Sequence, residues 1–70
     1  MKFILYLSLC SFSNNTCFPP ITYNEVFKDW NSCVIAGIDI SIKVMKTLDI
    51  KEINKLKLST QYSCEEQQGA

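Results

Sequence analysis

The residues with the clearest chemical potential in this chain are its four cysteines, Cys10, Cys17, Cys33 and Cys64. An even number of cysteines in a short chain is typical of a disulfide framework in an oxidising compartment. Gaps of six, fifteen and thirty residues separate them, so no C-x-x-C pair occurs. Structural zinc sites and thioredoxin-like redox centres use such close pairs. The spacing therefore favours two disulfides over a metal site or a redox centre.

Other catalytic and binding chemistry has few candidates among the remaining residues. The chain has no histidine, which is the commonest general base and metal ligand, and so none to activate a cysteine nucleophile. Seven lysines balance seven acids and there is no arginine, which argues against a nucleic-acid surface. Five lysines between Lys43 and Lys57 are expected to form a solvated face. We expect no enzyme activity, no cofactor and no nucleic-acid partner.

Seventy residues, 47% of them hydrophobic, indicate one small ordered domain. Below about 80 residues a core rarely supplies more than ~3–5 kcal/mol, so disulfides would matter to stability. We place the domain at residues 1–65 and a polar C-terminal tail at residues 66–70.

The N-terminal segment has two interpretations. Lys2 followed by the apolar residues 3–9 resembles a short signal peptide, with small residues for a cleavage site at Ser11 and Ser13. The run is too short for a transmembrane helix, which needs about 20 residues. Cleavage after Ser13 would remove Cys10 and leave three cysteines. We favour a retained strand over residues 3–10, with the signal peptide as the alternative.

The rest of the chain divides at its turn residues and helix caps. Residues 11–16 are a turn, and Pro19-Pro20 leads into an extended segment. Asp29 is a good N-cap for a long helix that ends near Leu48. Asp49 and Glu52 then form the pattern of a capping box, which predicts a short helix to about Lys55.

A last strand is predicted over residues 56–64, where polar and apolar side chains alternate. We expect it to run parallel to the first strand after a right-handed crossover. The predicted fold is a small two-layer α+β domain, with a two- or three-stranded sheet covered on one face by one long helix plus a short helix.

Helical periodicity assigns a core face to the long helix. Its members are Trp30, Cys33, Val34, Gly37, Ser41, Val44, Met45 and Leu48. Gly37 and Ser41 stand at its middle, where larger side chains would be expected. They either let the helix approach a strand closely, or Gly37 is a tolerated weak point that costs about 1 kcal/mol against alanine.

Side-chain parity selects the cysteine pairing. The more apolar set of the first strand, which includes Leu5 and Leu9, should face the helix, so Cys10 points to the open face. Cys64 lies on the helix-facing side of the last strand, and Cys33 on the sheet-facing side of the helix. The parity favours Cys33–Cys64 and Cys10–Cys17, because other pairings would reach through the sheet.

Three isoleucines lie outside the core face of the long helix: Ile35, Ile38 and Ile42. We expect them to form an exposed stripe that serves self-association or a protein partner. The alternative is ordinary surface, since singly exposed apolar residues are normal.

The cysteines and their neighbours also resemble a known group of sequences, on the runs Leu9–Ser11, Asn15–Pro20, Trp30–Cys33 with Gly37, and Tyr62–Cys64. These runs resemble short uncharacterised four-cysteine proteins encoded by marine phages and marine bacteria. The relatives often carry an aromatic residue where this chain has Ile38. The resemblance covers nearly the whole chain and implies no activity.

The expected function is a non-catalytic small structural or interaction module, phage-encoded if the resemblance holds. A virion accessory or decoration protein is one alternative, and a thiol redox protein is another. Disulfides would favour an oxidising compartment or a virion as the location.

Overall fold

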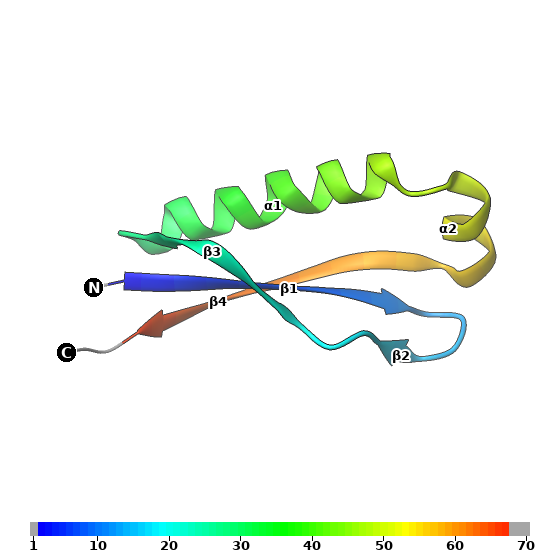
Figure 1. Ribbon diagram of the computed structural model, residues 1–70, viewed down its shortest axis with the longest axis horizontal. Coiled ribbons are helices and arrows are strands. Elements are labelled where there is room, and N and C mark those ends of the chain that lie inside the picture. Colours follow the sequence, from blue (N-terminus) through cyan, green and yellow to red (C-terminus); the bar gives the residue numbers. More distant parts are fainter. Residues whose placement is uncertain (1, 68–70) are drawn as a thin grey trace.

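A computed structural model describes residues 2–67 as two layers, with a sheet on one side and the helices on the other (Figure 1). It confirms the predicted small α+β fold with one long and one short helix. In chain order the elements are β1 (Lys2–Ser11), β2 (Thr16–Cys17), β3 (Ile21–Phe27), α1 (Trp30–Thr47), α2 (Ile50–Leu56) and β4 (Leu58–Gln67).

The central strand of the sheet is β1, which is paired along both edges. One edge pairs with β4 over its full length, from Lys2 opposite Gln67 to Ser11 opposite Leu58. The other edge pairs first with β3 and then with β2, both antiparallel. The four strands therefore occupy three positions, with β2 and β3 sharing one of them.

The predicted parallel arrangement of the first and last strands is wrong. β4 runs antiparallel to β1. The extended segment after Pro20 forms β3, which returns the chain along β1 to the starting end of the sheet. As a result α1 runs in the same direction as β1, and β4 must run back against it (Figure 1).

Side-chain caps fix the starts of both helices, as the sequence predicts. The Asp29 carboxylate accepts a hydrogen bond of 2.7 Å from the backbone N–H of Ser32 at the start of α1. Asp49 accepts one of 3.2 Å from the N–H of Lys51 in α2. β4 continues to Gln67, beyond the predicted end of the strand, and residues 68–70 of the predicted tail lie outside the described residues.

The buried core lies between α1 and the sheet and centres on Phe3, Leu5 and Cys33. The side chains packed around these three are Leu7, Tyr23, Phe27, Ala36, Ile40 and Cys64. Trp30, which was expected on the core face, is 57% exposed, because it begins α1 at the end of the sheet. Its ring still meets Phe3 edge to face at 5.9 Å.

Gly37 is buried where α1 crosses the sheet, and the close-approach interpretation is the one that the structure supports. A Cβ atom there would meet the ring of Tyr62 on β4 and would lie 3.2 Å from Cδ1 of Leu5 on β1. The axis of α1 therefore passes above the space between β1 and β4.

Candidate interaction surface

The four cysteines form two pairs, which are the pairs that parity predicts. The sulfur atoms of Cys10 and Cys17 lie 2.07 Å apart, on directly opposite residues of β1 and β2. Those of Cys33 and Cys64 lie 2.18 Å apart and join α1 to β4. No free thiol remains among the four.

The Cys33–Cys64 pair is more deeply buried than the Cys10–Cys17 pair. Each pair has one buried member, since Cys33 is fully buried and Cys10 is 5% exposed, whereas Cys64 is half-buried and Cys17 is exposed. Attack by an external thiolate requires access to a sulfur atom. The pairs therefore act as ties, one closing the β1–β2 turn and the other holding α1 on β4.

The predicted stripe is exposed on α1. The exposed fractions are 57% for Ile35, 46% for Ile38 and 49% for Ile42. Ile42 also lines a hollow of about 360 Å³ between α1 and β4, together with Met45, Ser59 and Thr60. The hydroxyl of Thr60 is buried there without a hydrogen-bond partner among residues 2–67.

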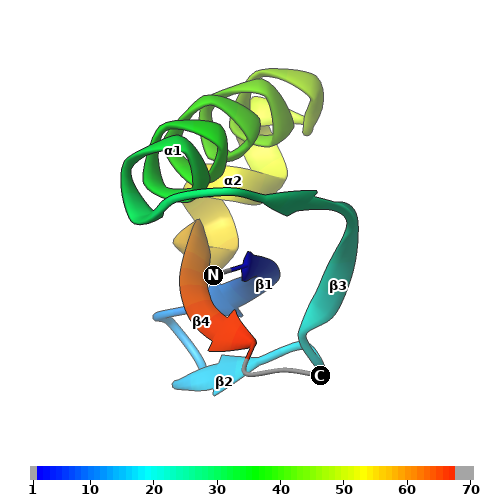
Figure 2. The same cartoon turned by 90° about the vertical axis from the view of Figure 1, so that its left-hand side faces the viewer.

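The two flanks of α1 differ because the sheet extends further on one side. On the flank above β1 and β3, Ala36 and Ile40 pack on the same core as Tyr23 and Phe27. On the other flank the sheet formed by residues 2–67 ends at β4, so no strand within this range lies beyond it to cover the isoleucines. Figure 2 shows α1 above the β4 side, with β3 on the far side.

The outer edge of β4 is unpaired within the described part of the chain, where its pairing partner is β1. Along its ten residues this edge carries backbone N–H and C=O groups that can pair with another strand. Charged residues stand at its two ends, with Lys57 directly before it and Glu65 and Glu66 near its end. The isoleucine stripe (Ile35, Ile38 and Ile42) approaches β4 at Ile42, which shares a hollow with Ser59 and Thr60.

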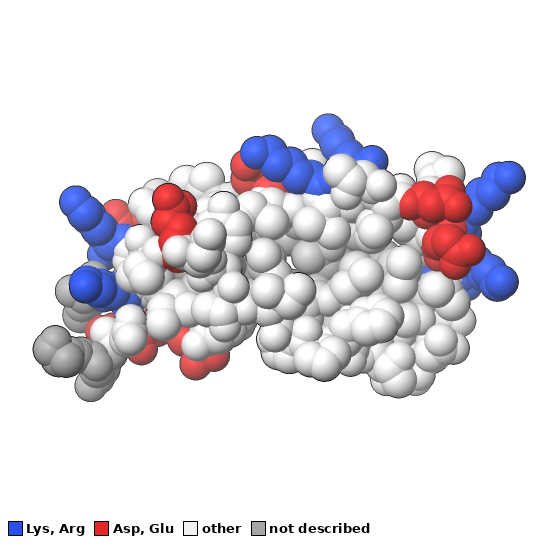
Figure 3. All heavy atoms as spheres, viewed as in Figure 1, with Lys and Arg blue, Asp and Glu red and all other residues white. Residues whose placement is uncertain are grey.

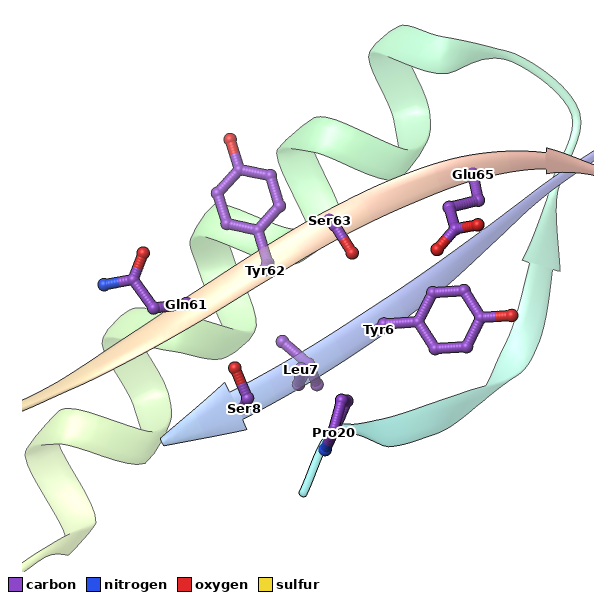
Figure 4. A pocket seen from close by; sticks show the side chains of 8 residues that line it. All are labelled: Tyr6, Leu7, Ser8, Pro20, Gln61, Tyr62, Ser63 and Glu65. Carbon is purple, nitrogen blue, oxygen red and sulfur yellow. The ribbon is translucent and has the colours of Figure 1, made fainter. Parts of the chain in front are cut away.

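A separate groove of about 420 Å³ lies mainly on the open face of the sheet (Figure 4). Its lining consists of Tyr6, Leu7, Ser8, Pro20, Gln61, Tyr62, Ser63 and Glu65. Hydroxyl, amide and carboxylate groups there can hydrogen-bond to a polar ligand. The lining includes no imidazole and no thiol.

Charged side chains lie at the two ends of the molecule and along the outer side of α1, and the middle of the visible face is uncharged (Figure 3). On α1 Lys43 and Asp39 form an exposed ion pair at 3.1 Å. Hydrogen bonds from the backbone and side chain of Ser32 lower the pKa of Asp29, because this carboxylate caps α1.

Over residues 2–67, no group of three or more histidine, cysteine or acidic residues could hold a metal ion. No helix in that range has the length and apolar character to cross a bilayer.

Sequence reasoning found the isoleucines but missed the edge beside them. The sequence did not predict β3 as a strand. Because β3 occupies one edge of β1, it determines which edge remains for β4. The alternation of residues 56–64 did indicate a strand, although periodicity carries no information on whether a strand is central or at an edge.

Comparison of the chain with models of protein families, with curated proteins and with solved structures found no match in any of the three.

Proposed function

We propose that this protein is a non-catalytic interaction module that binds a protein surface through the isoleucine stripe. The observation that carries this proposal is the exposure of Ile35, Ile38 and Ile42 on one flank of α1, each by nearly half or more. Burial of one such side chain contributes about 1.5–3 kcal/mol. Three of them on one flank provide a substantial driving force for association.

The fold presents this stripe rigidly. The Cys33–Cys64 disulfide fixes one part of α1 to β4, and the contact of Gly37 with Tyr62 fixes the next turn. A surface that is ordered before binding loses less conformational entropy when it binds. The two disulfides and the rigid helix thus suit a binding module whose surface is ordered before it binds, and not one that changes shape to fit its partner.

The setting of this function follows from the disulfides and the resemblance. Two disulfides suit an oxidising compartment or a virion. The resemblance to phage and marine bacterial proteins favours a phage gene, and in that case an accessory or decoration role on the particle.

The stripe is tested with the variant Ile35→Lys/Ile42→Lys and the control Ser32→Lys, an exposed position on another face of α1. Affinity purification from the native source is followed by rebinding of the identified partner to purified protein. We expect saturable binding by wild type and by Ser32→Lys, and its loss in the double variant. Equal binding by all three folded proteins would contradict the proposal.

A further inference from the structure

The isoleucine stripe and the free edge of β4 form one continuous surface. The hollow shared by Ile42, Met45, Ser59 and Thr60 connects the two. An edge strand can pair with a strand of another molecule, and an apolar helix flank can pack on another helix. A partner that satisfies both must bring a strand edge and a helix in the same relative position. A second copy of this chain has that arrangement.

The position of α1 over the sheet fits such a pair of copies. Gly37 lies against both Leu5 on β1 and Tyr62 on β4, and the Cα atoms of Cys33 on α1 and Cys64 on β4 are only 6.2 Å apart, so α1 lies close above the β4 side of the sheet. Strands pair about 4.8 Å apart. If two β4 edges pair, the α1 helix of each copy therefore lies beside the seam on the same face as its counterpart, within reach of a helix-to-helix contact.

Charge selects the antiparallel orientation. Lys57 lies four residues before Gln61 and Glu65 lies four residues after it. Antiparallel pairing about Gln61 brings Lys57 of each copy to Glu65 of the other, twice by symmetry. Parallel pairing would instead place Glu65 and Glu66 beside their own copies, which is repulsive.

Side-chain parity restricts the register. Residues directly opposite each other in an antiparallel pair point to the same face of the sheet. The two helices therefore cover the same face only if one residue of β4 stands directly opposite its own copy, with the two-fold axis midway between the two. Among such registers, the one centred on Gln61 brings Lys57, the left-handed C-cap residue of α2 directly before β4, nearest to Glu65 of the other copy.

We propose that two copies associate through β4 in antiparallel pairing about Gln61, to form one continuous sheet, while the α1 helices pack through Ile38 of one copy and Ile42 of the other. This rests on the proposed function and names the partner as a second copy. The assembly has closed two-fold symmetry, because each copy uses the same surface. The chain carries no net charge, so long-range repulsion between copies is small.

A charge exchange tests the pairing in sedimentation equilibrium of the oxidised protein. Lys57→Glu and Glu65→Lys should each weaken the dimer by about tenfold, because like charges replace two ion pairs. The double variant Lys57→Glu/Glu65→Lys should return to within about threefold of wild type. Lys28→Glu, the same change in the turn between β3 and α1, is the control and should leave the dimer unchanged.

A cysteine at the two-fold axis tests the register. Gln61→Cys should give a disulfide-linked dimer under mild oxidation, because a residue on the axis lies about 4.5–5.5 Å from its copy, within disulfide reach. Ser63→Cys is the matched control. Its copy would lie about 14 Å away, two residues off the axis on each strand, and should not link.

The outcomes separate this inference from the proposed function. A dimer that is restored by the charge exchange and linked through position 61 supports it. A wild type that stays monomeric at all concentrations overturns it. So does a dimer whose dissociation constant is the same in wild type, Lys57→Glu and Glu65→Lys. In either of those cases the proposed function still stands if Ile35→Lys/Ile42→Lys loses a protein partner that wild type binds.

Discussion

A Cβ atom on Gly37 would lie 2.6 Å from Cδ2 and 2.8 Å from Cγ of Tyr62. Real Cβ atoms essentially never approach other atoms so closely, and Cγ cannot move away by a simple rotation of the ring. Glycine in the middle of a helix usually costs about 0.5–1 kcal/mol relative to alanine. Here we expect the opposite sign: Gly37→Ala should lower the free energy of unfolding by about 1–3 kcal/mol through overpacking. Urea denaturation of the oxidised protein measures it.

The control for this prediction is the same substitution in a Tyr62→Ala background. Without the ring, the main obstacle to a Cβ at position 37 is gone, and Leu5 need shift by only a few tenths of an ångström. Gly37→Ala should then be neutral or stabilising. Equal destabilisation in both backgrounds would show that the contact with Tyr62 does not restrict residue 37.

Ser11 should contribute more to stability than its place in a predicted turn suggests. Its side chain is 6% exposed, and its Oγ donates a hydrogen bond of 2.7 Å to the carbonyl of Leu56. This bond joins the end of β1 to the end of α2. Ser11→Ala should cost about 0.5–1.5 kcal/mol, because it removes this hydrogen bond, while the Leu56 carbonyl keeps the backbone N–H of Ser13 at 3.3 Å. Chemical denaturation beside the exposed control Ser13→Ala measures the difference, and equal losses would contradict it.

The two disulfides should contribute unequally. The Cys33–Cys64 bond spans 31 residues and the Cys10–Cys17 bond spans 7. Restriction of the unfolded chain then contributes about 3.7 and about 2.4 kcal/mol, respectively. Cys33 is also fully buried, so Cys33→Ser should lower the melting temperature more than Cys17→Ser does. The double serine variants of each pair control for free thiols. A larger loss at Cys17 would contradict this order.

Asp29 should make the stability of the protein sensitive to acid. Hydrogen bonds from Ser32 lower its pKa in the folded state below the ordinary value of 3.8. A lowered pKa stabilises the fold at pH values above the ordinary pKa, and this contribution is lost as pH falls through the folded value. Asp29→Asn keeps a capping side chain but cannot ionise. Its stability relative to wild type should therefore improve below about pH 4; a constant difference across the acid range would contradict this.

The features that the sequence predicts well are those that depend on neighbours along the chain. Asp29 and Asp49 mark the two helix starts because a cap acts within three residues. The alternation of side chains between the two faces of the first and last strands also predicted the Cys33–Cys64 and Cys10–Cys17 pairs. β3 was not predicted as a strand, because Asn24 and Glu25 interrupt its apolar pattern and its strand form depends on pairing with β1.

That one missing strand accounts for the wrong direction of β4 and for the missed surface beside it. The exposure of Ile35, Ile38 and Ile42 could be predicted, since helical periodicity places them off the core face. Their position beside a free strand edge could not, because it depends on the order of the strands. Strand order is a property of pairings between residues far apart in the chain.

Removal of residues 1–13 should abolish the fold. β1 supplies Phe3 and Leu5 to the core and is the strand with which β2, β3 and β4 all pair. Without it, these three strands lose their ladder and Cys17 loses its partner Cys10. A chain that starts at Asn14 should therefore lack near-ultraviolet circular dichroism and cooperative unfolding, whereas the full chain refolded in parallel shows both. Intact mass of the protein from its native source should accordingly include β1 and fall by four hydrogen atoms for the two disulfides. A folded native protein whose mass begins at Asn14 would contradict both the retained strand and the central role of β1.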